Sequence, residues 1–417
     1  MHQRRIPEWL RHRPTPGVRG FALIAGLEAV TRGILISVFP LVIYRALNDA
    51  RVVSEAYFLV GIASLAAGLL VPWLARFIPR RWIYITGSLM FVAGAAFAIQ
   101  GTASSVIAAL ALNTIATVVC FVCFNAYVLD FVVRNDLGQC ETSRMFYSAL
   151  GWTLGPAVGV ILMDYWAPAP FVISGVAALA MLALFLYMRL GNGRLITKSR
   201  KPPPNPLAFL PRFLAQPRLV AGWLFAVLRS CGWWVYVVYL PIFCVEAGLG
   251  DRLGGIVLSI TNGTLFLTPF MLRWMKARSI RLAVRAGFLI AGILFSTATA
   301  VTFLPWLSVA FLMAGSFFLI LLDVSAGLPF LLAVKPSERT EMSAVYASYR
   351  DVSSIVTPGV AWFVLLVAPV SGIFVAGGLA LIAGWALAAN LNPRLGQDRI
   401  RFTPPRPTTV SAGNLDL

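Results

Sequence analysis

Long apolar segments alternate with short polar segments along the whole chain. The apolar segments run for about 20 residues, which is the length that a helix needs to cross a bilayer. They do not show the alternation over about ten residues that is typical of membrane barrel strands. The pattern therefore predicts an all-α integral membrane protein with twelve transmembrane helices. The expected spans are 20–44, 54–75, 82–100, 104–132, 145–164, 168–189, 218–243, 253–272, 283–302, 306–332, 343–366 and 370–390.

The composition agrees with a membrane protein. Hydrophobic residues make up 59% of the 417 residues and charged residues only 12%, and the mean hydropathy is +0.82. A soluble domain has roughly 45–50% apolar and about 25% charged residues. The polar, arginine-rich start of the chain, which has no small-residue cleavage site, does not resemble a signal peptide.

Basic residues are distributed unevenly between the two sides of the predicted membrane. The net charge is +18, and 28 of the 34 Lys and Arg residues fall in the two tails and in the loops after even-numbered helices. This bias predicts that both termini are cytoplasmic, in what we expect to be a bacterial inner membrane. Basic charge placed in this way faces anionic lipid headgroups rather than nucleic acid.

The chain contains two related halves. The segment that starts at Pro16 aligns without a gap with the segment that starts at Pro217. Helices 5 and 11 align in the same way and pair Pro156 with Pro358. The sequence therefore predicts two pseudo-symmetric six-helix bundles. The expected domains are a cytoplasmic tail (1–19), the first bundle (20–190), a cytoplasmic linker (191–217), the second bundle (218–392) and a disordered cytoplasmic tail (393–417).

A belt of polar and charged side chains lies within the spans. Most members lie roughly 10–16 Å from the cytoplasmic helix ends. Charged residues inside a membrane are costly and mark functional sites by default, although a self-paired network that only holds the halves together is the alternative. The members of the belt are Glu28, Arg32, Asn125, Arg229, Asp323, Arg350 and Asp351.

Asp323 is the acid of the belt that we expect to carry protons. It lacks a basic neighbour within one turn on its own helix, whereas Glu28 has Arg32 four residues later. On helix 7, Trp233 and Tyr236 share roughly one face with Arg229. These aromatic rings either stack on a solute or belong to an interfacial aromatic belt.

Helix 5 contains several poor helix formers. Gly151, Gly155 and Gly159 recur every four residues and form a smooth stripe, and Pro156 permits a bend. Small residues let membrane helices approach closely. We expect this stripe to lie either in a moving seam where one half closes against the other or in tight static packing.

These features together resemble the major facilitator superfamily, over about residues 18–392. The stretch "GLLVPWLARFIPRRW" is similar to the superfamily's loop between helices 2 and 3. Arg76, Arg80 and Arg81 fit that loop, but Ala75 stands where an aspartate is common. The helix 5 stripe is similar to a signature of the superfamily's antiporters. The resemblance implies that helices 1, 4, 7 and 10 line a central cavity.

The resemblance implies a secondary active transporter that moves a small organic solute by alternating access. We expect coupling to protons, export rather than import, and a monomer that needs no cofactor. A transport-inactive scaffold or assembly factor is the alternative. An enzyme is not expected, because the sequence shows no phosphate-binding loop, nucleophile or metal cluster. The five cysteines do not form a disulfide framework.

Overall fold

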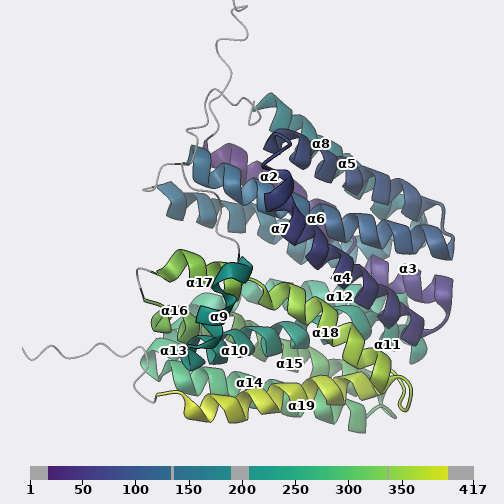
Figure 1. Ribbon diagram of the computed structural model, residues 1–417. Coiled ribbons are helices and arrows are strands. Elements are labelled where there is room, and N and C mark those ends of the chain that lie inside the picture. The colour runs from purple at the N-terminus through teal and green to yellow at the C-terminus, as the bar shows by residue number, and fades with distance from the viewer. Residues whose placement is uncertain (1–16, 133–135, 189–205, 336–337, 393–417) are drawn as a thin grey trace, which may run out of the picture.

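Helices arranged in two groups make up the described part of the chain, residues 17–132, 136–188, 206–335 and 338–392 of a computed structural model (Figure 1). The first group contains α2 (Val18–Gly33), α3 (Val38–Leu47), α4 (Ala50–Leu74), α5 (Arg80–Ile99), α6 (Ala103–Phe131), α7 (Leu137–Tyr165) and α8 (Ala169–Tyr187). The second group contains α10 (Pro217–Trp234), α11 (Leu240–Glu246), α12 (Asp251–Gly263), α13 (Thr268–Ala277), α14 (Ile280–Ala300), α15 (Pro305–Ser325), α16 (Leu328–Ala333), α17 (Arg339–Tyr346), α18 (Tyr349–Val364) and α19 (Ser371–Leu387).

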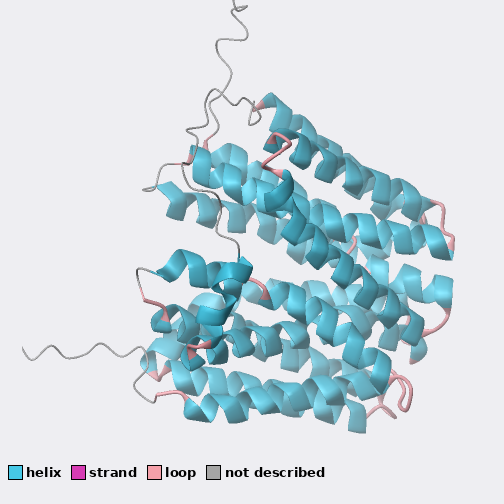
Figure 2. Cartoon of the chain, viewed as in Figure 1, coloured by secondary structure: helices cyan, strands magenta, loops and turns pink. Residues whose placement is uncertain are grey.

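The predicted all-α membrane fold is confirmed. Within the described ranges, no strand occurs (Figure 2), and eleven helical segments are long and apolar enough to cross a bilayer. The expected span 343–366 is divided between α17 and α18, which are separated by two residues, so it contains no single helix of that length.

Several spans are interrupted, and proline is one cause. The first span changes from α2 to α3 through a short turn before Pro40. The seventh passes from α10 through a five-residue π-helix, η2 (Val235–Tyr239), into α11, whose second residue is Pro241. Since proline has no backbone N–H, it removes one helical hydrogen bond. The related prolines therefore interrupt the equivalent helix of each half.

Several helices begin directly after a side chain that caps their N-terminus. The Asp49 side chain accepts a hydrogen bond from the Arg51 backbone N–H at 2.7 Å at the start of α4. Thr102 caps α6 and Ser279 caps α14 in the same manner. These side chains satisfy backbone donors that a helix start leaves free.

The linker contains a helix that the sequence analysis did not foresee. Residues 206–214 of the expected linker 191–217 form α9 (Pro206–Leu214), which packs on α17. Arg212 forms an ion pair with Glu338, which also accepts a hydrogen bond from Gln216 at 3.2 Å. The Gln216 hydrogen bond and the Arg212 charge hold the pKa of Glu338 below its ordinary value. The rest of the linker and most of both tails lie outside the described residues.

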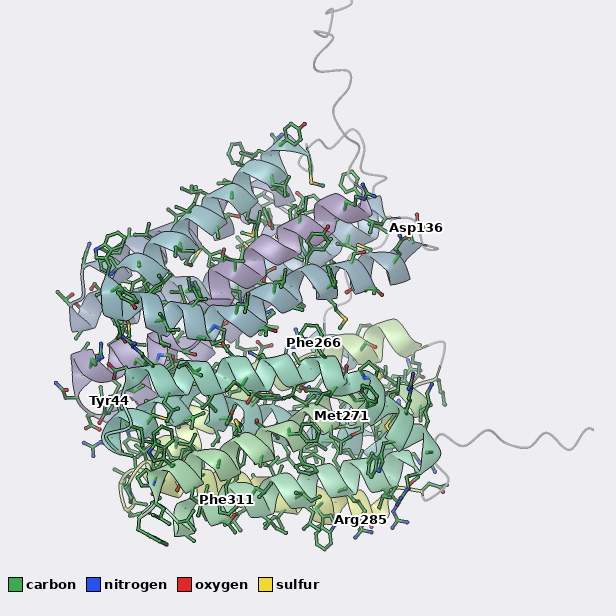
Figure 3. All side chains as sticks on the ribbon, turned by 180° about the vertical axis from the view of Figure 1, so that it is seen from behind. Tyr44, Asp136, Phe266, Met271, Arg285 and Phe311 are labelled. Carbon is green, nitrogen blue, oxygen red and sulfur yellow. The ribbon has the colours of Figure 1, made fainter. Side chains whose placement is uncertain are left out.

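The two halves meet at one end of the molecule. Figure 3 shows Tyr44 at this end and Asp136 at the opposite end. The helices that join the halves are α4 with α18 and α7 with α12. We call the end with Tyr44 the closed end and the end with α9 and α17 the terminal end.

Candidate functional site

A charged cluster in the second half links α10 to α15. The Asp323 carboxylate lies 3.2 Å from Arg229 Nε and accepts a hydrogen bond from Trp233 Nε1 at 3.1 Å. Asp323 keeps 34% of its side chain exposed, although it lies ten residues, or about 15 Å, from the end of its span at Ala333. An exposed carboxylate at this depth indicates a water-accessible face rather than a lipid-facing one.

Arg350 extends this cluster toward the first half. Its Nε donates a hydrogen bond to the Tyr349 hydroxyl at 3.1 Å. Its guanidinium carbon lies 5.3 Å from the ring centroid of Phe121 on α6. The Arg229 guanidinium carbon lies 5.3 Å from the Tyr349 ring. Tyr349 is therefore placed between two guanidinium groups, one of which contacts the other half.

Asp351 follows Arg350 on α18 and is half-buried. Its backbone carbonyl accepts a hydrogen bond from Ser354 Oγ at 2.8 Å. Its carboxylate forms no ion pair with any residue that the structure describes. The positive charge that acts on Asp351 is that of Arg350, the preceding residue, without a direct ion pair.

In the first half, Glu28 and Arg32 form the ion pair that their spacing on one helix predicts. Arg32 Nη1 lies 3.2 Å from Glu28 Oε1, and the Arg32 guanidinium carbon lies 5.1 Å from the Trp152 ring centroid. The Trp152 carbonyl accepts a hydrogen bond from Asn262 Nδ2 at 2.7 Å. Sequence reasoning missed Trp152, because it looked at this part of α7 only for its glycines.

Asn125 lies on α6 away from Asp323, with a partner that the sequence analysis assigned to a loop. Arg144 Nη2 donates to Asn125 Oδ1 at 3.2 Å, and its Nη1 lies 2.5 Å from Glu141. The Arg144 guanidinium carbon also lies 4.7 Å from the Phe124 ring centroid. Arg144 belongs to α7, which starts eight residues earlier than the predicted span.

Tyr236 packs in the core of the second half in this conformation, and its contact with a solute stays a prediction. Its side chain is fully buried, and its hydroxyl is hydrogen-bonded to Thr261 Oγ1 at 2.7 Å. Thr261 is in turn 3.0 Å from Ser316 Oγ. The Trp233 ring lies next to the Tyr236 ring, with the two ring centroids 6.1 Å apart, and reaches Asp323 with its Nε1.

Of the two alternatives for the glycine stripe, the structure shows tight packing within the first half rather than a seam between the halves. A Cβ atom added at Gly155 would lie 2.5 Å from the carbonyl carbon of Gly33 on α2. A Cβ atom added at Gly151 would lie 2.7 Å from the carbonyl carbon of Ala29, and one added at Gly159 would lie 2.1 Å from the carbonyl oxygen of Ile34. The stripe therefore lets the α7 and α2 backbones touch, as small residues do in membranes.

The predicted prolines lie where the halves meet. The Pro156 carbonyl oxygen on α7 would be 2.5 Å from a Cβ added at Gly255 on α12. Pro358 is buried in α18, and its neighbour Gly359 faces the Phe58 ring of α4. These two prolines mark the α7–α12 and α4–α18 contacts.

The basic loop between α4 and α5 uses an acid from another helix. Arg80 Nη1 lies 2.5 Å from Asp130 Oδ2 on α6, which takes the place of the aspartate missing at Ala75. Arg81 stacks on a neighbouring tryptophan ring. Arg76 is exposed and forms no ion pair in the described part of the chain.

Polar contacts join the halves at the closed end, and the sequence analysis did not predict them. In each pair, the two residues come from different halves. The Tyr44 hydroxyl donates a hydrogen bond to Glu246 Oε1 at 3.0 Å. The residues involved lie near helix ends on the side away from the termini, where a single sequence gives no sign of pairing. The pairs are Tyr44–Glu246, Arg45–Asp251 and Asp164–Arg252.

Each ion pair of the belt lies within one half, Glu28–Arg32 in the first and Arg229–Asp323 in the second. Among the described residues, no group of three or more His, Cys, Asp or Glu side chains is placed to hold a metal ion. The five cysteines are free and buried.

Comparisons with known proteins agree with this geometry. The sequence model of the Major Facilitator Superfamily matches residues 21–358. The crystal structure of the nucleoside transporter NupG is similar in fold, with a TM-score of 0.69 at 12% sequence identity, over 90% of this chain and 99% of that one. A point mutant of NupG gives a TM-score of 0.68 at 13% identity, over 89% and 99%.

No curated protein sequence matches the chain. The family match spans well over half of the chain, and the all-helical fold in two groups agrees with it. The chain belongs to the Major Facilitator Superfamily of secondary transporters.

Proposed function

We propose that this transporter moves a small organic solute by alternating access and couples that movement to protons. The observation that carries the proposal is the one-sided contact between the halves. α7 contacts α12 through residues from Trp152 to Asp164. At the other end of α7, Met145 and Phe146 are 75% and 68% exposed. Closure at one end, with charged groups accessible between the halves, is what alternating access requires.

Asp323 is the acid that we propose to carry the proton. In this conformation its carboxylate is paired with Arg229 and Trp233, all within the second half. Protonation would remove the charge that holds Arg229. Because both partners belong to one half, rocking of the halves alone does not separate them, and the proton itself has to release the pair.

Orientation and direction are further parts of the proposal. The bias of basic residues supports cytoplasmic termini in a bacterial inner membrane. The helix 5 signature favours export in exchange for protons. Nucleosides, which NupG carries, serve as the uncharged members of the panel of solutes to test in this chain.

The test is transport by the purified protein in liposomes with an imposed pH gradient. We expect Asp323→Asn to abolish uphill solute transport, because an amide accepts hydrogen bonds but does not titrate, and to leave exchange at equal pH largely intact. Asp136→Asn, an exposed acid at the terminal end, is the matched control and should behave as the parent protein.

Two outcomes would contradict the proposal. Normal pH-driven accumulation by Asp323→Asn would make this acid structural, with Glu28 as the next residue to test. Failure of any solute to move through the parent protein would favour the alternative of a transport-inactive scaffold.

A further inference from the structure

Arg350 differs from the other arginines of the belt in its partners. Arg32 is paired with Glu28 and Arg229 with Asp323, each at 3.2 Å. Within the described ranges, no carboxylate lies within ion-pair distance of Arg350, and its hydrogen-bond partner is the neutral Tyr349 hydroxyl. A guanidinium carries five N–H donors, so most of its donors are free to bind a ligand.

The surroundings of Arg350 suit an aromatic or apolar ligand body. Phe121 comes from the other half and leaves 38% of its surface exposed, while its ring stacks against the guanidinium at 5.3 Å. Tyr349 covers a second side at 5.7 Å. A guanidinium stacked on rings presents its edge to a ligand, which is the geometry for bidentate carboxylate binding.

The local charge favours one negative charge on the ligand. Arg229 and Arg350 flank Tyr349, and Asp323 neutralises Arg229. Asp351 is the next residue on α18, about 100° further around the helix axis, and it does not form an ion pair with Arg350. The two guanidinium groups and the two carboxylates, Asp323 and Asp351, balance in charge, so a ligand meets the free N–H donors of Arg350 rather than an excess of positive charge. A monocarboxylate adds one negative charge to this balanced cluster, whereas a dianionic phosphate monoester adds two.

We infer that Arg350 binds the carboxylate of the transported solute, and that the solute is an organic monoanion with an aromatic or apolar body. This inference rests on the proposed transport function and names the class of its substrate. A carboxylate on Arg350 lies between α18 of one half and Phe121 on α6 of the other. A solute held there contacts both halves and favours their closure around it.

Binding to the purified full-length protein tests the inference without any gradient. Benzoate is the probe, benzamide is its neutral isostere and phenyl phosphate is the dianion, each titrated by calorimetry. We expect benzoate to bind saturably, and at least tenfold more tightly than benzamide or phenyl phosphate. Arg350→Gln should weaken benzoate binding by about tenfold to a hundredfold, the effect of losing a hydrogen-bonded charge, and Arg350→Lys should restore part of it.

The matched control is Arg273→Gln on α13. Arg273 is also an exposed arginine over a phenylalanine ring, Phe270, at 5.8 Å, but it lies outside the belt. Its substitution should leave benzoate binding unchanged.

Equal binding of benzoate and benzamide, absence of benzoate binding, or unchanged binding in Arg350→Gln would each overturn the inference. These outcomes are distinct from failure of the proposed function. A transporter of neutral or cationic solutes would still accumulate its solute in liposomes, whereas a scaffold would accumulate none.

Discussion

The helix α7 packs against α2 on one face and against α12 on another, and the two faces differ in the kind of contact that they make. Toward α2, its glycine stripe brings backbone against backbone, with Gly155 opposite Gly33 and Gly159 opposite Ile34. Toward α12, the contacts are polar and partly made by side chains. The Ala157 N–H donates to Ser259 Oγ at 2.8 Å, and Asn262, further along α12, bonds a backbone carbonyl.

The difference follows from what each contact loses on separation. Backbones in close contact lose dispersion attraction along the whole stripe, and lipid tails replace it poorly because they cannot fill the narrow groove. Polar groups that separate can bond to water in a hydrated cavity. We therefore expect the α2 face to hold one half together and the α12 face to be the one that opens in the proposed transport cycle.

The largest effect is expected from a methyl group on the α2 face. In Gly155→Ala, the added Cβ would lie 2.5 Å from the Gly33 carbonyl carbon, so the helices have to separate. We expect the free energy of unfolding to fall by about 3 kcal/mol, with less folded protein in fluorescence-detected size-exclusion chromatography. Gly263→Ala is the matched control, because its nearest new contact is a Thr153 methyl carbon at 3.9 Å. Equal stability of both variants would show that the stripe is not tightly packed.

A smaller loss of stability is expected from a glycine-to-alanine substitution on the α12 face, together with a shift of conformation. In Gly255→Ala, the Cβ would lie 2.5 Å from the Pro156 carbonyl oxygen and from a Val160 methyl carbon. The halves can relieve this clash by separating at the closed end, so we expect a shift of conformation with little loss of folded protein. An introduced cysteine at Ser54, which is fully buried beside Tyr239, should react with a thiol reagent about tenfold faster, equivalent to about 1.4 kcal/mol.

The control for that experiment is the same cysteine in the Gly155→Ala background at a temperature where the protein stays folded. Its reaction rate should match that of the parent. Loss of folded protein in Gly255→Ala without faster labelling would mean that the α12 contact is as permanent as the α2 contact.

Much of the fold and part of the site follow from the sequence alone. Long apolar runs and the bias of basic residues are local signals, and they predict the membrane helices. The Glu28–Arg32 pair follows from their spacing on one helix. Its neighbour Trp152, by contrast, is brought there by the packing of α7 on α2, which a single sequence does not encode in a readable pattern.

Other features were not predicted, because they depend on which distant helices pack against each other. The glycine stripe correctly signals close packing, but only the three-dimensional structure shows that its partner is Gly33 on α2. Tyr236 shares a face with Trp233, as the spacing predicts, but only the structure shows that its hydroxyl is hydrogen-bonded to Thr261 in the core. The Arg80–Asp130 and Arg229–Asp323 pairs join distant helices, and no local rule selects one acid over another.

The central claim is that the halves move as units and close at one end at a time. Distances between spin labels on the two halves test this claim most directly. One pair spans the terminal end, at Met145 on α7 and Lys276 on α13, and the other spans the closed end, at Tyr165 and Leu304. All four positions are exposed. On addition of a transported solute, the account predicts that a population appears in which the first distance is shorter and the second is longer. Distances that stay fixed, or that both change in the same sense, would contradict it.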